Sequence, residues 1–359
     1  MQVADDPVGS LRPRIQGVLD DLLDRQRDVL GDQSPDLLPL VDAAAELLAG
    51  GKRLRPAFCY WGWRGTGAPD GPAILAAAAC LELFHAAALI HDDLMDGSDT
   101  RRGMPSAHRR FADVHAARQW RGDPDRFGGA VALLLGDLCL GWSDELLHSA
   151  GLPDEALRRG RPLFERMRTE LMGGQYLDVL EQASGGLWPA GQADRARRVI
   201  RYKSAKYSVE HPLLLGGALA GALLPLLAAY SAYGLALGEA FQLRDDVLGV
   251  FGDPDRTGKP AGDDLREGKR TLLVAYATER ATASQAATMS ELLGAPDLSD
   301  RDVDVLRGVI VGTGALDRVE HLVAELVGQS AAALDAAPVA AEARAALGVL
   351  ITAATARTV

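Results

Sequence analysis

Cysteine is scarce in this chain, and the few cysteines present are not arranged for chemistry. Only three of the 359 residues are cysteines, Cys59, Cys80 and Cys139; they form no CxxC pair and lie within apolar runs. A disulfide framework or a zinc site would need closely spaced ligands. The sequence therefore predicts three core thiols in a reducing, cytoplasmic compartment.

Positive charge is also in short supply. Lys and Arg number 38 against 49 Asp and Glu, which gives a formal net charge of -11. A protein that binds nucleic acid needs a basic face for the phosphates. The composition argues against a nucleic-acid partner, and an anionic substrate would have to be met by local groups of cations.

Three further patterns are missing: period-two runs of Val, Ile and Thr that would build strands, the basic and apolar start of a signal peptide, and an uninterrupted membrane span. The most apolar stretch, 213–237, is broken by glycines, Pro225 and Tyr230, and charged residues follow it at 244–246. We therefore expect a buried pair of helices there and no transmembrane segment.

Apolar residues at i, i+3, i+4 and i+7 predict helices through most of the chain. The expected helices are 9–31, 36–50, 54–65, 70–96, 107–119, 128–150, 153–183, 191–208, 212–250, 271–294, 302–313 and 315–356. Helices 70–96 and 212–250 are apolar nearly all round, which is typical of the centre of a bundle. The sequence thus predicts an all-α fold in one large domain over residues 1–359, with residues 1–10 disordered.

Each of these two central helices ends in an acidic cluster. Asp92 and Asp96 are one helical turn apart with Asp93 beside them, so we expect three carboxylates to converge. Asp245 and Asp246 close the second helix. Mg²⁺ is usually held by a few carboxylates together with the phosphates of a substrate. The alternative is a solvated helix end, although acids at a C-terminus oppose the helix macrodipole.

Cations occur in compact groups elsewhere in the sequence. The groups are Lys52, Arg53 and Arg55; Arg101 and Arg102; Lys203 and Lys206; and Lys259 and Lys269. Surface solvation is the better explanation of any one group alone. Together with the acidic clusters, they predict a pocket that binds polyphosphate through metal bridges and direct contacts.

Five segments together resemble the trans-isoprenyl diphosphate synthases, or polyprenyl synthetases, and in particular the bacterial geranylgeranyl diphosphate synthases. They are GGKRLRP (50–56), ELFHAAALIHDDLMDGSDTRRG (82–103), GGQYLD (173–178), KSAKYS (203–208) and FQLRDDVLGVFGDPDRTGKPAGDDLREGK (241–269). The resemblance covers residues 40–275. It implies an all-α homodimer of the isoprenoid synthase type, whose acidic motifs face each other across a deep central cavity and hold about three Mg²⁺ ions.

The resemblance also implies a role for individual residues. The metal ligands would be Asp92, Asp93, Asp96, Asp245 and Asp246. The allylic diphosphate (dimethylallyl, geranyl or farnesyl) would contact Arg101, Lys203, Ser204, Gln242 and Lys259. Isopentenyl diphosphate would contact Lys52, Arg55, His85 and Arg102, with Lys269 as a further phosphate contact. The catalytic set would be Asp92, Asp93, Arg101, Lys203, Asp245 and Lys259.

Some positions keep a second interpretation. His85 taken alone is best explained as a core histidine. Its position seven residues before the first acidic motif favours the substrate contact instead. Gln175 and Asp178 match cavity positions, although local pairing within a helix explains them almost as well. Gly249 stands where the family often has a third aspartate, so one metal contact is either lost or supplied by water.

The implied reaction is head-to-tail condensation of isopentenyl diphosphate with an allylic diphosphate. Ala87 and Ala88 lie about one turn before the first motif, and Phe84 about one turn further, so Phe84 is the expected floor for the growing chain. The expected main product is geranylgeranyl diphosphate (C20). The alternatives are a product of C25 or above, farnesyl diphosphate, a class I terpene cyclase, and a noncatalytic subunit.

Overall fold

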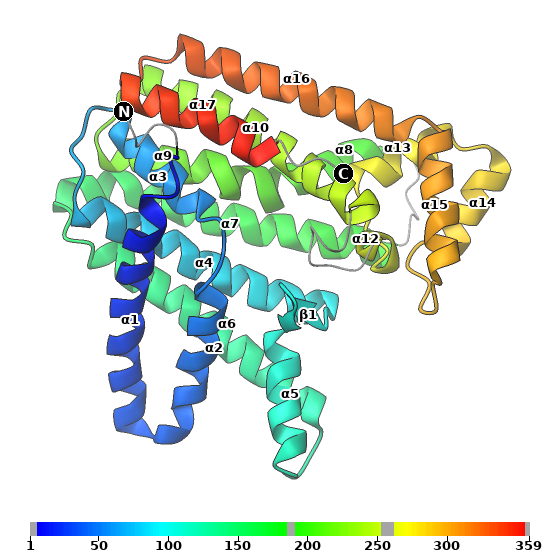
Figure 1. The fold of residues 1–359 in the computed structure, drawn as a ribbon, viewed down its shortest axis with the longest axis horizontal. Coiled ribbons are helices and arrows are strands. Elements are labelled where there is room, and N and C mark those ends of the chain that lie inside the picture. The colour runs from blue at the N-terminus through cyan, green and yellow to red at the C-terminus, as the bar shows by residue number, and fades with distance from the viewer. Residues whose placement is uncertain (1–5, 185–190, 253–261, 356–359) are drawn as a thin grey trace. The chain divides into compact units, whose positions relative to one another are not determined.

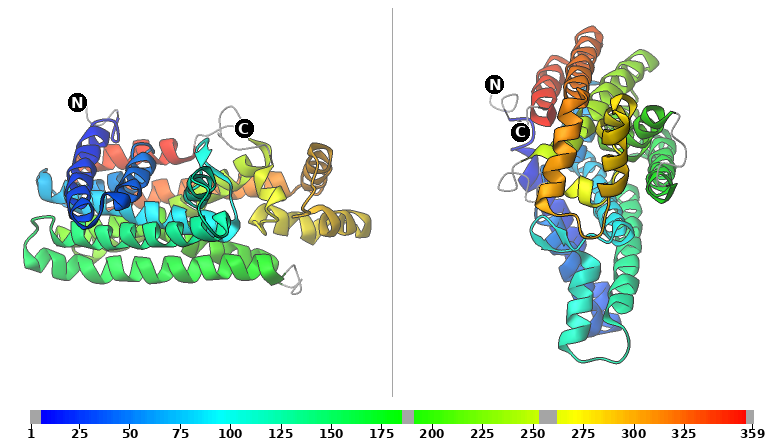
Figure 2. Two further views of the ribbon diagram at one scale, coloured as in Figure 1. Left: turned by 90° about the horizontal axis from the view of Figure 1, so that it is seen from below. Right: turned by 90° about the vertical axis from the view of Figure 1, so that its right-hand side faces the viewer.

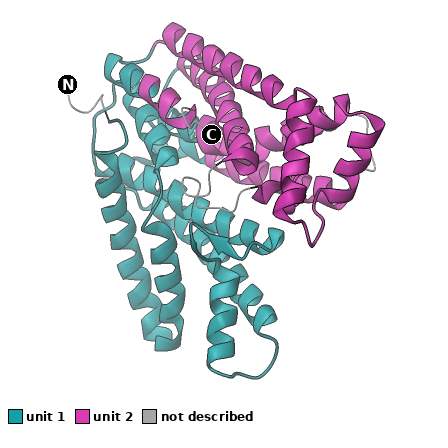
Figure 3. Cartoon of the chain, turned by 45° about the vertical axis from the view of Figure 1, so that its right-hand side comes forward, with its two compact units in different colours: residues 1–161, 212–223, 339–347 teal, residues 162–211, 224–338, 348–359 magenta. Residues whose placement is uncertain are grey.

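The computed structural model describes residues 6–184, 191–252 and 262–355, and these are nearly all helical (Figure 1). The all-α prediction is confirmed. The chain divides into two compact units (Figure 3), in which unit 1 comprises residues 1–161, 212–223 and 339–347, and unit 2 comprises residues 162–211, 224–338 and 348–359. The single domain over residues 1–359 stays a prediction.

Unit 1 holds the N-terminal helices and a short hairpin. Its elements are α1 (Leu11–Gln33), η1 (Pro35–Leu37), α2 (Leu38–Leu48), α3 (Leu54–Arg64), α4 (Pro72–Asp96), β1 (Thr100–Arg101), β2 (Met104–Pro105), α5 (Ala107–Ala117), α6 (Pro124–His148), the start of α7 (Asp154–Ser184), most of α9 (His211–Leu219) and the start of α17 (Ala341–Thr355). Helices α1 and α2 lie side by side as an antiparallel pair (Figure 1).

Helix α4 is the core of unit 1, packed against α1, α3 and α6. It begins with Pro72 in the first turn and ends at Gly97, whose left-handed φ of 66° suits a helix C-terminus. Among the described residues, α4 is the one helix long and apolar enough to cross a membrane, but 72% of its most apolar window is buried in the structure. That burial is typical of the core helix of a soluble protein.

Unit 2 holds the remaining helices. They are the rest of α7, α8 (Gln192–Val199), the π-helix η2 (Ile200–Glu210), α10 (Leu224–Phe251), α12 (Asp263–Arg266), α13 (Leu272–Arg280), α14 (Ala283–Leu292), α15 (Asp300–Gly312), α16 (Ala315–Ala336) and the end of α17. Its core gathers apolar residues of α10, α13, α15 and α16, among them Leu243, Val247, Leu273 and Ile310. Helices α14 and α15 lie side by side (Figure 2).

Four expected helices are each divided in the structure. Helix 191–208 becomes α8 and the π-helix η2, and helix 212–250 breaks at a turn around Gly221, whose φ is +80°. Helix 271–294 breaks where Thr282 forms a capping box with Gln285 and starts α14. Helix 315–356 breaks near Pro338, which lacks the backbone N–H that a helix interior needs. The stretch 213–237 is therefore a pair of helices, as expected.

The N-terminal segment differs from its prediction. Residues 1–5 lie outside the described residues, but residues 6–10 form a packed turn rather than a disordered tail. Val8 is buried, and Trp61 Nε1 donates a hydrogen bond to the Pro7 carbonyl at 3.0 Å. These contacts tie the start of the chain to α3.

A buried ion pair links the segment before α3 to α4. Arg53 is 5% exposed and Glu82 is also 5% exposed, and the Arg53 guanidinium donates to the Glu82 carboxylate. It also donates to Gln16 Oε1 at 2.6 Å and to the Leu48 carbonyl. Arg53 therefore joins α1, α2 and α4 and is a structural residue within a cation-rich motif.

Removing the carboxylate of this pair should lower the free energy of unfolding. Glu82→Ala leaves the Arg53 charge buried and uncompensated, which costs about 3–5 kcal/mol. The exposed pair of Arg110 and Glu46 offers a control, because Glu46→Ala should cost less than about 1 kcal/mol. Urea denaturation measures both free energies of unfolding. Equal losses in the two variants would contradict a structural role for the buried pair.

Candidate functional site

The first acidic motif occupies the last turn of α4. Asp92 and Asp96 are half-buried, whereas Asp93 is only 3% exposed. Arg101 Nε donates to Asp93 Oδ1 at 2.9 Å and to Oδ2 at 3.2 Å. Asp93 therefore turns toward Arg101, and the expected convergence of three carboxylates is not seen here. The physical reason is that a carboxylate this deeply buried needs a cationic partner.

The β1–β2 hairpin holds Arg101 in this position. Arg101 pairs with Met104, and the two residues between them, Arg102 and Gly103, have φ values of 54° and 76°. Two successive left-handed residues give the tight turn that matches strand twist. Because Arg101 Nη2 also lies 3.8 Å from Asp92 Oδ2, this single guanidinium contacts both neighbouring aspartates.

A second group of cations surrounds His85, also in unit 1. Burial lowers the pKa of His85 well below 6.5, and the positive charges of Arg55, Arg102, Arg101 and Arg53 lower it further. The structure therefore brings together Arg55, His85 and Arg102, three of the residues predicted to hold isopentenyl diphosphate. The neutral imidazole adds no charge to that of the four guanidinium groups, two of which pair with the carboxylates of Glu82 and Asp93.

Arg102 bridges this group to the glycine-rich segment before α3. Its Nη1 donates to the Leu47 carbonyl at 3.4 Å, and its guanidinium passes Gly51, where a Cβ would lie 3.4 Å from Nη2. Gly51 has a φ of +109°, a conformation that glycine adopts readily. Lys52 follows on the exposed side of the same segment. The GGKRLRP motif thus supplies one structural arginine, Arg53, and a second arginine, Arg55, whose charge acts on His85.

The second acidic motif lies at the end of α10 in unit 2. Asp245 is half-buried and Asp246 is 6% exposed, and Gln242 Nε2 donates to Asp246 Oδ1 at 2.8 Å. Burial raises the pKa of Asp246 to about 8, and the carboxylates of Asp264 and Asp245 add to that rise. Gln242, predicted as a phosphate contact, supports this aspartate. No role had been assigned to Asp264 from the sequence.

Lys203 is presented by the π-helix η2. A Cβ on Gly174 of α7 would lie 2.8 Å from Lys203 Cα, and one on Gly238 of α10 would lie 2.7 Å from Ala205 Cα. Both glycines therefore let neighbouring helices approach η2 closely. Lys203 Nζ contacts Asp178 Oδ2 at 2.6 Å, so Asp178 pairs with a residue of another helix, and pairing within α7 alone does not account for it.

A neighbouring network of charged side chains was not predicted by any sequence motif. Lys206 Nζ lies 2.6 Å from Glu170 Oε2, which also accepts a hydrogen bond from His211 Nε2 at 2.8 Å. Burial lowers the pKa of His211 and the Glu170 carboxylate opposes that effect. Lys206 is thus tied into unit 2 and differs from Lys203 in its partner.

The remaining predicted contacts lie in unit 2 or outside the described residues. Lys269 Nζ lies 3.6 Å from Asp264 Oδ1 and also contacts Glu267. Ser204 is half-buried on η2 beside Lys203. Lys259 lies outside the described residues. Lys269 is therefore held by acidic neighbours after α12.

The predicted chain-length residues lie along one side of α4. Phe84 and Ala87 have no exposed surface, whereas Ala88 is half-buried like Asp92, four residues later. Ala88 and Asp92 share a helix face with Phe84, because i and i+4 residues stack on one another. The accessible part of this face therefore ends at Phe84.

The carboxylates of both motifs fit Mg²⁺ by their chemistry. In the described part of the chain, no three His, Cys, Asp or Glu side chains gather around one metal-sized point. Mg²⁺ does not require such a cage, since it is commonly bound by one or two carboxylates plus substrate phosphates and water. Asp92 and Asp96 provide such a pair, and the crowded carboxylates near Asp246 carry negative charge that a divalent cation relieves.

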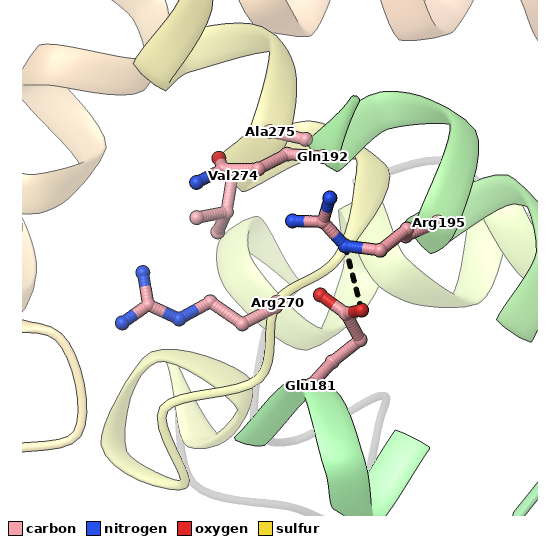
Figure 4. A pocket seen from close by; sticks show the side chains of 6 residues that line it. All are labelled: Glu181, Gln192, Arg195, Arg270, Val274 and Ala275. Carbon is pink, nitrogen blue, oxygen red and sulfur yellow. Dashed lines mark ion pairs between the residues drawn. The ribbon is translucent and has the colours of Figure 1, made fainter. Parts of the chain in front are cut away.

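One small pocket in unit 2 contains none of the predicted site residues (Figure 4). Glu181, Gln192, Arg195, Arg270, Val274 and Ala275 line it. Arg195 Nε lies 2.7 Å from Glu181 Oε1, and burial lowers the pKa of Arg270 while Glu181 opposes that effect. The pocket is a charged junction between α7, α8 and α13.

The stability of the ligand-free protein should depend on pH through His85. Its pKa is lowered on folding, so the unfolded chain binds the proton first, and stability is lost as pH falls below about 6.5. Between pH 7 and pH 5.5 the loss should be about 1 kcal/mol more in wild type than in His85→Asn. Urea titrations across this range measure it, with His321→Asn as an exposed control. Parallel curves for wild type and His85→Asn would contradict the assignment.

Comparisons with known proteins agree on one family. The model of the polyprenyl synthetase family matches residues 39–308. A geranylfarnesyl diphosphate synthase from Aeropyrum pernix is 33% identical over 276 residues, covering 76% of this chain and 79% of that protein. A nonaprenyl diphosphate synthase from Mycobacterium tuberculosis is 30% identical over 329 residues, covering 88% and 84%.

A solved structure supports the same assignment. The geranylgeranyl pyrophosphate synthase from Corynebacterium glutamicum, complexed with isoprenyl diphosphate and magnesium, superposes with a TM-score of 0.93. It is 39% identical and the match covers 98% of this chain and 99% of that one. The fold is therefore the all-α isoprenoid synthase fold. This chain belongs to the polyprenyl synthetase family, as a prenyltransferase that elongates prenyl chains.

Proposed function

We propose that this enzyme joins isopentenyl diphosphate to an allylic diphosphate head to tail and makes geranylgeranyl diphosphate as its main product. One observation carries the proposal: unit 1 provides more guanidinium groups than one diphosphate needs. Arg101 contacts the acidic end of α4, and Arg55 and Arg102 lie within electrostatic reach of His85, as Arg101 also does. Such a set suits two neighbouring diphosphates, since guanidinium groups bind phosphate oxygens in pairs.

In the proposed reaction the allylic C1–O bond breaks and its electron pair leaves with pyrophosphate. The C3=C4 π electrons of isopentenyl diphosphate then form the new bond from C4 to the allylic C1. A proton leaves C2 to the departing pyrophosphate, and its bonding electrons form the new double bond. Arg101 and Lys203 would stabilise the charge that develops on the leaving group.

About three Mg²⁺ ions would complete the site, in keeping with the magnesium dependence of this family. Asp92 and Asp96 would hold the metal in unit 1, and Asp245 and Asp246 in unit 2. Bound metal would neutralise charge on the diphosphate as the C–O bond breaks. Asp93 would act mainly by holding Arg101, because its carboxylate is buried against that guanidinium.

Neither rival function, terpene cyclase or noncatalytic subunit, accounts for the cations near His85. A class I terpene cyclase ionises one diphosphate and has no use for a second diphosphate site. A noncatalytic subunit would not need an intact acidic motif. The group formed by Arg55, His85 and Arg102 therefore favours the synthase.

The product length rests on α4. Phe84 is fully buried one turn beyond the half-buried Ala88, which favours a short distance between the metal-binding residues and the point where chain growth stops. The name of the Corynebacterium glutamicum structure supports C20. The names of the two other relatives point to longer chains, so C25 or above is the alternative.

Homodimer formation and a cytoplasmic location complete the proposal. On α7 in unit 2, Met172, Tyr176 and Val179 are 44%, 66% and 38% exposed. Their i, i+4 and i+7 spacing places them on one stripe of the helix. An exposed apolar stripe of this kind suits a second copy of the chain.

Loss of either arginine beside His85 should weaken one substrate more than the other. Arg55→Gln or Arg102→Gln removes a charge-assisted contact, so the KM for isopentenyl diphosphate should rise at least about tenfold and more than the allylic KM. Initial rates with each allylic primer and Mg²⁺ measure this, and product analysis identifies the chain formed. Arg109→Gln, at an exposed pair with Asp99, is the control. Conversion of one prenyl diphosphate to a hydrocarbon without isopentenyl diphosphate would favour the cyclase.

Substitutions along α4 should change the product length in opposite directions. Ala87→Phe should shorten the main product to C15, and Phe84→Ala should lengthen it, because one fills and the other opens the same channel. Leu75→Ala is the matched control, since it also leaves a cavity beside α4 but lies nine residues before Phe84, on the opposite face of the helix. Chromatography of the dephosphorylated products at 25 °C measures chain length. An unchanged product in both test variants would show that the chain does not run along this face.

A further inference from the structure

Gly249 leaves an empty position in the second acidic motif, and another residue reaches into it. A Cβ built on Gly249 of α10 would overlap Asp264 Oδ2 and would lie 2.6 Å from the Asp264 carboxyl carbon. Real Cβ atoms are essentially never that close to another heavy atom. The Asp264 side chain therefore occupies the space where a side chain at position 249 would begin.

The surroundings of Asp264 hold its carboxylate at α10. Asp264 lies on the short helix α12, whose Leu265 is fully buried in the core of unit 2. The Lys269 backbone N–H donates to the Asp264 carbonyl at 3.0 Å, and Lys269 Nζ lies 3.6 Å from Asp264 Oδ1. Asp264 thus reaches α10 from a fixed segment rather than from a loose loop.

Asp264 also belongs electrostatically with the second motif. Its carboxylate acts on Asp246 more strongly than the carboxylate of Asp245 does, although Asp245 is the neighbour in sequence. Asp264 and Asp245 are therefore both electrostatic neighbours of Asp246 at the end of α10, although the three carboxylates do not gather around one metal-sized point in the ligand-free structure.

We propose that Asp264 supplies the third carboxylate of the second acidic motif, and that Gly249 serves to leave room for it. The inference rests on the proposed binding of Mg²⁺ and diphosphate at this motif. Asp264 would accept hydrogen bonds from the water around the metal or bind the metal itself, both of which carboxylates do in magnesium sites. Gly249 would then be kept despite the cost of glycine in a helix, about 0.5–1 kcal/mol relative to alanine.

This arrangement makes an unusual prediction for a conservative change. Gly249→Ala removes no charge and should not destabilise the helix, yet its new Cβ would push the Asp264 carboxylate aside. Metal-dependent binding should therefore weaken while the thermal midpoint stays the same or rises. A purely structural role for Gly249 predicts the reverse, a lower midpoint with unchanged binding.

The test is calorimetric titration of the full-length protein with inorganic pyrophosphate in the presence of Mg²⁺, with thermal midpoints measured in parallel. Asp264→Ala and Gly249→Ala should each weaken binding at least about fivefold. The exchange variant Gly249→Asp with Asp264→Ala should recover most of the wild-type affinity, because the carboxylate returns from the other side of the same space. Asp263→Ala and Gly308→Ala are the controls, since Asp263 is the adjacent acid and a Cβ at Gly308 meets open space.

The outcomes separate this inference from the proposed function. Metal-dependent binding that is strong in wild type and equally strong in Asp264→Ala would overturn the role of Asp264 and leave the proposed function intact. Failure of the exchange variant to bind better than Asp264→Ala would overturn the equivalence of the two positions. Absence of metal-dependent pyrophosphate binding in wild type would overturn the proposed function, and the inference with it.

Discussion

The arrangement of unit 1 depends on the conflict between an apolar helix and the charges at its end. Helix α4 is buried along most of its length, and a carboxylate such as Asp93 cannot be buried there as an isolated charge. The contact with Arg101 neutralises the Asp93 charge, and the β1–β2 hairpin places Arg101 where it can make this contact. The same contact fixes a guanidinium beside Asp92, so the requirement for stability also builds the candidate site.

A second buried ion pair also neutralises a carboxylate on α4. Arg53 pairs with Glu82, also on α4, and ties in the segments that precede α3. Replacing one partner of such a pair is far more costly than its net contribution to stability. The cation-rich motif GGKRLRP therefore has two uses. Arg53 stabilises the fold, and Arg55 acts on His85, where the proposed function places isopentenyl diphosphate.

Much of this could be predicted from the sequence because helical periodicity and motif spacing are local signals. The long helices and the acidic ends of α4 and α10 follow from such patterns, whereas the grouping of cations with His85 was implied by the family resemblance. The helix break at Thr282 was missed, since capping chemistry competes with periodicity over a few residues. The partners of individual side chains could not be predicted from these local patterns.

Asp93 and Asp264 show why side-chain partners escape a sequence argument. The spacing of Asp93 gave it the same weight as its neighbours, and only the hairpin decides that it faces Arg101. Asp264 lies fifteen residues after Gly249 on a different helix, and no periodicity relates them. Such pairings are set by tertiary packing, where a missing side chain in one element makes space for a side chain of another.

Three of the predicted phosphate-binding cations share a feature that explains how an acidic protein could bind polyanions. Arg101 is held by Asp93, Lys203 by Asp178, and Lys269 by Asp264 and Glu267. Each carboxylate positions its cation and lowers the repulsion among cations before the substrate arrives. A guanidinium carries five N–H donors and an ammonium three, so one carboxylate partner uses only part of this capacity. The net charge of -11 and the proposed binding of diphosphate are therefore compatible, because carboxylates also preorganise these cations.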